Sequence, residues 1–197
     1  GRAGSQVLLG AQNMYFEEKG AFTGAVSPAM LKDLNCEFVI LGHSARRWVF
    51  GESDELINKK VLAAFAKGLI PVLCVGEKLE EREKNLTDQV ILNQLEKNLK
   101  GVSEQHLRGI VIAYEPVWAI GTGKNATTKD AKDAIALIRE FIHSRYGSET
   151  AAKVRILYGG SVKPENISTY MEQDGIDGAL VGGASLEADS FAKLTRF

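Results

Sequence analysis

Residues 113–124 read Ala113-Tyr114-Glu115-Pro116-Val117-Trp118-Ala119-Ile120-Gly121-Thr122-Gly123-Lys124. An apolar run ends here in a carboxylate, and the loop that follows is first stiff and then rich in glycine. Pro116 restricts one φ angle, and the bulky Trp118 can anchor the near end of the loop. Gly121 and Gly123 allow the backbone to approach a ligand closely. The stretch therefore predicts a strand that ends in a candidate catalytic base, Glu115, followed by a lid over residues 116–124.

Apolar runs separated by connecting segments recur along the chain. Short runs rich in β-branched residues suit buried parallel strands. They cover residues 7–9, 38–41, 70–75, 110–114, 154–158 and 178–181. Helical periodicity follows Ser53 and Thr127, two candidate N-caps, and Leu92, Leu95 and Leu99 repeat the helical spacing. The acidic segment 77–83 is expected to be a solvated face.

Strict alternation of strands and helices predicts a parallel α/β fold, either an open doubly wound sheet or a closed barrel. The polar residues favour the barrel. His43, Glu115, the Gly159-Gly160-Ser161 segment and the Gly182-Gly183 pair each follow a predicted strand, where barrels gather their ligands. The G-x-G-x-x-G turn of a dinucleotide fold is not visible. We expect one domain over residues 1–197 with about six βα units, against the roughly eight of a complete barrel.

Composition argues against several classes of protein. The net charge is −1 in 197 residues, without the basic stripe that nucleic acid or an acidic membrane requires. No apolar run approaches the ~20 residues of a membrane span. Cys36 and Cys74 lie far apart, which disfavours a disulfide framework or a zinc site. The sequence thus predicts a soluble, cytoplasmic protein without a metal or a cofactor.

The motifs together resemble the triosephosphate isomerase family. They are Gly42-His43-Ser44, residues 113–124 and Tyr158-Gly159-Gly160-Ser161-Val162, in that order. The similarity runs from Gly10-Ala11-Gln12-Asn13 to Leu180-Val181-Gly182-Gly183-Ala184-Ser185-Leu186 and so covers essentially the whole chain. It implies a TIM barrel that interconverts dihydroxyacetone phosphate and glyceraldehyde 3-phosphate in glycolysis and gluconeogenesis, by proton transfer through an enediolate.

The resemblance assigns the two catalytic roles. Glu115 corresponds to the family's base, a carboxylate that a closing lid can shield from water. His43 corresponds to the electrophile, which hydrogen-bonds the substrate oxygens as a neutral imidazole. In this family, which is itself the known example of the effect, a helix N-terminus lowers the pKa of that histidine. A helix beginning at Ser44 would supply that terminus.

The resemblance also implies a phosphate site, made by Gly121, Ser161, Gly182 and Gly183. Backbone N–H groups and the Ser161 hydroxyl would point at the phosphate dianion, and a short helical turn near Ala184 would add its dipole. Taken singly, each glycine is better explained as a turn residue than as a ligand contact. Their convergence at one end of a barrel favours the phosphate site.

Residues 12–24 resemble the loop with which one subunit of the family inserts into its twin. The matching positions are Gln12, Asn13, Phe16, Phe22 and Thr23. Two aromatic residues on a long loop suit an interface anchor, so a two-fold homodimer is expected. The alternative is a local turn that packs on its own barrel.

Two departures from the family pattern bear on activity. The family begins with a strand that carries an Asn and a Lys, and these 197 residues contain no counterpart, so the family's first two βα units are expected to be absent. Ala45 stands where the family ordinarily has a Glu. A soluble barrel would then need a complementing N-terminal segment from another polypeptide, self-association through the open edge of the sheet, or a rearranged closure. A non-catalytic module that binds phosphate or pairs with another subunit is the main alternative, and another phosphate-binding barrel is a remote one.

Overall fold

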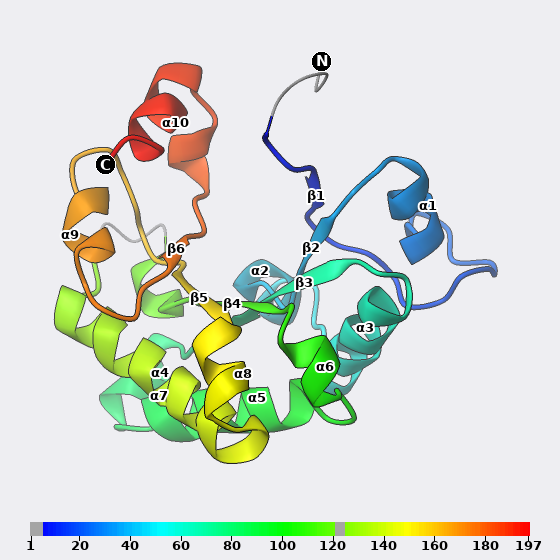
Figure 1. Ribbon diagram of the computed structural model, residues 1–197, viewed down its shortest axis with the longest axis horizontal. Helices are drawn as coiled ribbons and strands as arrows, with labels where there is room; N and C mark the ends of the chain where they lie inside the picture. Colours follow the sequence, from blue (N-terminus) through cyan, green and yellow to red (C-terminus); the bar gives the residue numbers. More distant parts are fainter. Residues whose placement is uncertain (1–5, 121–124) are drawn as a thin grey trace.

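Six parallel strands form one curved sheet in the computed structural model, which describes residues 6–120 and 125–197. Each strand pairs with the next along the chain, in the order β1 to β6, so that β1 and β6 are the two edges (Figure 1). This is the strand order of a (β/α)8 barrel with part of the ring open, which confirms the predicted α/β barrel class. The strands are β1 (Gly10–Ala11), β2 (Phe38–Leu41), β3 (Ile70–Val75), β4 (Val111–Tyr114), β5 (Arg155–Tyr158) and β6 (Gly178–Ala179).

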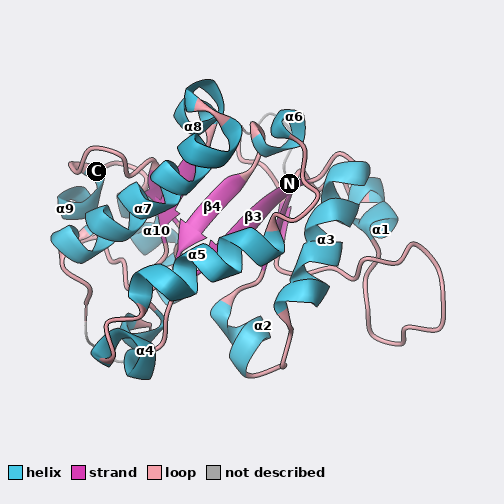
Figure 2. Ribbon diagram, turned by 90° about the horizontal axis from the view of Figure 1, so that it is seen from below, coloured by secondary structure: helices cyan, strands magenta, loops and turns pink. Residues whose placement is uncertain are grey.

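Helices cover the outer face of this sheet. Figure 2 shows α3, α5 and α7 lying across the strands, with α3 packed on β2 and β3 and α7 on β4 and β5. The helices are α1 (Pro28–Asp33), α2 (Ser44–Trp48), α3 (Asp54–Ala66), α4 (Leu79–Glu83), α5 (Thr87–Asn98), α6 (Glu104–Leu107), α7 (Thr128–Tyr146), α8 (Ser148–Lys153), α9 (Ile167–Met171) and α10 (Ala188–Leu194), with single 3-10 turns η1 (Val117–Ala119) and η2 (Gly183–Ser185). Among the described residues, none of these helices combines the length and the apolar character needed to cross a membrane.

The central strands are buried on both faces. Leu73 and Ile112 point outward into the main core beneath the helices, and both are fully buried. Their neighbours Cys74 and Ala113 point to the inner face and form a second, smaller cluster. Burial on both faces is why the strand sequences are continuously apolar instead of alternating.

Side-chain caps set the start of the two longest helices, as predicted. The Ser53 hydroxyl accepts a hydrogen bond from the Leu56 N–H at the start of α3. Thr127 and Asp130 form a capping box at the start of α7. The following apolar residues, which include Val61 in α3, are buried against the sheet. These local signals fix where the strand-following segments turn into helices.

The edge strands differ from the prediction. Regular pairing begins only at Gly10, and Val7 is 63% exposed, so the strand predicted at residues 7–9 is wrong. At the other edge β6 covers Gly178–Ala179, although the Leu180 N–H still donates to the Tyr158 carbonyl at 2.9 Å. An edge strand has a partner on one side only. The Leu9 carbonyl still accepts a hydrogen bond from the Glu37 N–H at 2.8 Å, but the apolar side chains of residues 7–9 are exposed.

The core beneath the helices should dominate stability. Leu73→Ala removes a fully buried side chain and should lower the free energy of unfolding by about 2–5 kcal/mol, measured by urea denaturation. The matched control is Leu186→Ala, because Leu186 is 82% exposed and should change that free energy by less than about 0.5 kcal/mol. Equal losses in the two variants would contradict the assigned core.

Candidate active site

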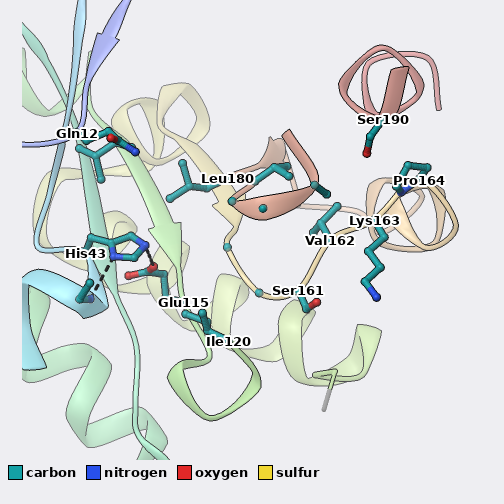
Figure 3. A pocket seen from close by; sticks show the side chains of 18 of the residues that line it. Gln12, His43, Glu115, Ile120, Ser161, Val162, Lys163, Pro164, Leu180 and Ser190 are labelled. Carbon is teal, nitrogen blue, oxygen red and sulfur yellow. Dashed lines mark hydrogen bonds and ion pairs between the residues drawn. The ribbon is translucent and has the colours of Figure 1, made fainter. Parts of the chain in front are cut away.

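The strands end level at one edge of the sheet, and this brings distant residues together. The register pairs Leu41 with Leu73, and Val75 with Tyr114. The chain therefore leaves β2 and β4 on the same side, at His43 and Glu115. A cavity of about 940 Å³ opens there. Its lining includes Gln12, Ile40, His43, Ala45, Glu115, Ile120, Ser161, Leu180, Gly182 and Gly183 (Figure 3).

Glu115 is held at both carboxylate oxygens. It is 2% exposed and directly follows β4. Its Oε1 lies 2.9 Å from Nε2 of His43, and its Oε2 accepts a 2.9 Å hydrogen bond from the Ser44 N–H. Both partners come from the exit of β2, so the carboxylate is oriented by a segment 71 residues away in the chain.

His43 is the N-cap of the short helix α2. Its Nδ1 accepts a 3.1 Å hydrogen bond from the Ala45 N–H, which places the proton of the neutral ring on Nε2, facing Glu115. The hydrogen bond to the Glu115 carboxylate raises the pKa of His43, against the opposing effect of burial. The lowered pKa expected from the family is therefore not found in this arrangement. The carboxylate contacts the imidazole directly, and this hydrogen bond has the largest effect on the pKa of His43, ahead of burial.

Two glycines make room for Glu115. A Cβ added to Gly76 would lie 1.7 Å from the Glu115 carbonyl oxygen, which no side chain can tolerate. A Cβ added to Gly159 would lie 3.2 Å from Cγ of Glu115. The strand ends on either side of β4 thus approach Glu115 more closely than residues with a side chain would allow.

Three of the four predicted phosphate residues line the same cavity. Ser161 follows β5, while Gly182 and Gly183 lie at the start of the turn η2. A Cβ at either glycine would meet nothing within 4 Å, so protein packing does not demand glycine there. The open space in front of this backbone is available to a ligand. Gly121 lies outside the described residues.

The comparison with known proteins agrees with this geometry. The family model for triosephosphate isomerase matches residues 2–197. The chain belongs to the triosephosphate isomerase family. It is 58% identical over 194 residues to the triosephosphate isomerase of Thermoanaerobacter pseudethanolicus, and the match covers 98% of this chain and 78% of that protein. Similar matches are the enzymes of Caldanaerobacter subterraneus subsp. tengcongensis, at 57% identity, and Carboxydothermus hydrogenoformans, at 58%, covering 78% and 77% of their lengths.

The segment that resembles the triosephosphate isomerase lid begins in a rigid turn. Val117–Ala119 form η1, with the Val117 N–H donating to the Glu77 carbonyl at 3.1 Å. The Trp118 indole N–H donates to the Glu77 carboxylate at 2.9 Å, and Ile120 lines the cavity. The further lid positions Thr122, Gly123 and Lys124 lie outside the described residues.

Glu77 is a buried residue next to the candidate site that the sequence analysis did not predict. The segment 77–83 was expected to be solvated, but Glu77 is fully buried and accepts hydrogen bonds from the Tyr114 hydroxyl and the Trp118 indole. Burial raises the pKa of its carboxyl group, and the hydrogen bonds partly offset that effect. Its position in the sequence could have indicated its place beside the site, because Glu77 follows the end of β3 closely, as Glu115 follows the end of β4.

The segment that resembles the triosephosphate isomerase dimer loop closes on itself through aromatic contacts. The Tyr15 ring lies 4.5 Å from that of Phe16 and 4.6 Å from that of Phe22, between centroids. Asn13 accepts a 2.9 Å hydrogen bond from the buried Lys60. Phe22 remains 41% exposed, and Thr23 is also exposed. Gln12 differs from the other loop residues because it lines the cavity.

The contact between His43 and Glu115 should be visible in a titration. The folded state holds the His43 proton more tightly than the unfolded chain does. The contact therefore adds stability fully below about pH 6.5, and this contribution is lost as the pH rises through the raised, folded-state pKa. In Glu115→Gln, NMR titration of the imidazole should show the pKa of His43 falling towards its ordinary value. The exposed control Glu140→Gln should leave it unchanged, whereas the same His43 titration in wild type and Glu115→Gln would contradict the contact.

Proposed function

We propose that the chain acts as a triosephosphate isomerase, which interconverts dihydroxyacetone phosphate and glyceraldehyde 3-phosphate. The observation that carries this proposal is the pair formed by Glu115 and His43, 2.9 Å apart, on the cavity that Ser161, Gly182 and Gly183 also line. A base, a hydrogen-bond donor and an anion site within one cavity are what proton transfer next to a carbonyl requires.

Glu115 would serve as the base. Its carboxylate takes a proton from the carbon beside the substrate carbonyl, which leaves an enediolate, and then returns the proton to the neighbouring carbon. The hydrogen bond from the Ser44 N–H orients Oε2, and Oε1 contacts the imidazole of His43, which also lines the cavity. Burial of Glu115 keeps bulk water from competing for the proton.

His43 would serve as the electrophile. Because Nδ1 accepts a hydrogen bond from the Ala45 N–H, Nε2 carries the proton of the neutral ring and can donate. A substrate oxygen would replace the Glu115 carboxylate as the acceptor of this hydrogen bond. The donor would then stabilise the negative charge that develops on the oxygens of the enediolate.

The phosphate would bind at Ser161, Gly182 and Gly183, together with Gly121 of the lid. Neutral N–H donors are one part of such a site, and the resemblance adds a lysine from a strand without a counterpart in these 197 residues. We infer that a complementing segment, equivalent to the part of the relatives' length outside the match, supplies that lysine and fills the open side of the sheet. Its charge would stabilise both the phosphate and the enediolate.

The assembly we propose is a homodimer. The loop residues Phe16, Phe22 and Thr23 would insert into the twin subunit. Exposed apolar side chains also gather at the end of α2, at Trp48, Val49 and Phe50, with 47%, 75% and 65% exposure, and such a group is typical of an interface. We also propose a cytoplasmic location, which the two buried, unpaired cysteines support.

A second candidate is a non-catalytic module that binds phosphate or pairs with another subunit. It is favoured by Ala45, which lines the cavity where the resemblance implies a carboxylate. A module of this kind would keep the phosphate site and the loop 12–24 but would not turn over the substrate.

An isomerase assay separates the two functions. We expect turnover of glyceraldehyde 3-phosphate when the chain is mixed with a peptide that carries the family's first two βα units. Glu115→Gln should then lower kcat about 10²- to 10⁴-fold, because it removes the base. The matched control Glu140→Gln changes an exposed carboxylate on α7 and should change kcat less than about two-fold.

Circular dichroism of each variant checks that the fold persists. Binding of phosphate without turnover in the folded mixture would favour the module. Equal activity of wild type and Glu115→Gln would refute the role of the base.

A further inference from the structure

Arg82 on α4 touches both ends of the segment that follows the candidate base. Its guanidinium carbon lies 4.3 Å from the centre of the Trp118 ring, and its Nη2 lies 2.8 Å from Oδ1 of Asp130. Trp118 belongs to η1, at the near end of the segment, and Asp130 to the first turn of α7, at its far end. The side chain is 32% exposed, so solvent only partly weakens these contacts.

At the far end, Asp130 links Arg82 to the N-cap of α7. Its Oδ2 accepts hydrogen bonds from the N–H of Thr127 at 3.0 Å and from the Thr127 hydroxyl at 2.7 Å. The other oxygen, Oδ1, binds Arg82. One carboxylate thus connects the guanidinium to the residue at which α7 begins.

At the near end, Trp118 is held on two sides. Arg82 covers one face of the ring, while the indole N–H donates to the buried Glu77 at 2.9 Å. Nη1 of Arg82 also lies 3.6 Å from the same Glu77 oxygen. Trp118 lies three positions after Glu115, so a ring held in this way limits the movement of the backbone that carries the base.

We propose that Arg82 is a positioning residue. It holds Trp118 and the Thr127 cap in a fixed relation, and through Trp118 it orients residues 116–120, which follow Glu115. A planar guanidinium can stack on an indole and bind a carboxylate with its edge at the same time, whereas a lysine ammonium cannot do both. The effect on turnover rests on the proposed isomerase function. The effect on Trp118 does not.

Trp118 fluorescence tests the proposal without reference to activity. The chain has two tryptophans, so Trp48→Phe leaves Trp118 as the single reporter. In that background Arg82→Met should shift the emission of Trp118 to longer wavelength and raise its acrylamide quenching constant roughly two-fold, because the covering cation is lost. The matched control is Arg108→Met, since Arg108 is 36% exposed and its ion pairs join Glu104 and Glu149 at a distance from Trp118. It should leave the emission unchanged.

The second measurement is turnover by the chain mixed with the peptide that carries the family's first two βα units. Arg82→Met should lower kcat about ten-fold and change KM less than about two-fold, because orientation of the base is lost and phosphate binding is not. Arg82→Lys should recover only part of kcat. Asp130→Asn keeps an oxygen for the Thr127 cap but loses the ion pair with Arg82. It should therefore shift the emission of Trp118 in the same direction as Arg82→Met does, by a smaller amount. This variant replaces Arg82→Met in the test if Arg82→Met does not fold.

Identical Trp118 quenching in Arg82→Met and Arg108→Met would overturn the proposal, as would full recovery of kcat by Arg82→Lys. A protein in which Arg82→Met exposes Trp118, but in which wild type has no turnover, would refute the isomerase function and support the positioning of Trp118.

Discussion

The site depends on one constraint, the level ending of neighbouring parallel strands. Because β2 and β4 each pair in register with β3, the residues that leave them emerge on the same side of the sheet. This is how the Ser44 N–H, 71 residues away in the chain, and the imidazole of the neighbouring His43 reach the two oxygens of Glu115. A register shift of one residue would reverse the faces of the whole strand and separate these groups. The strand register that packs the sheet therefore also fixes the relative positions of His43, Ser44 and Glu115.

Polar groups buried at this edge of the sheet require hydrogen-bond partners. Gly76 lets the backbone at Glu115 come close, and the next residue, Glu77, is fully buried beneath Tyr114 and Trp118. A buried carboxylate needs partners, and here the partners are the Tyr114 hydroxyl and the Trp118 indole N–H, from the residues around Glu115. The same contacts that satisfy Glu77 thus hold the residues on either side of Glu115.

The sequence predicted what depends on local pattern. The central strands, the caps at Ser53 and Thr127, and the placement of His43 and Glu115 after strands all follow from short-range signals. The rest depends on tertiary contacts. Burial of Glu77 requires Trp118, 41 residues away, and the raised pKa of His43 requires Glu115. The strand predicted at residues 7–9 is wrong, because strand pairing is a property of neighbours and not of the apolar run itself.

The central claim is that Glu115 moves a proton between adjacent carbons of a triose phosphate. Its most direct test is incubation of dihydroxyacetone phosphate with the complemented protein in deuterium oxide, followed by NMR of the recovered substrate and product. The account predicts that solvent deuterium enters at the carbon beside the carbonyl, and that Glu115→Gln abolishes this entry. Isomerisation without any deuterium, or equal deuterium entry in Glu115→Gln, would contradict it.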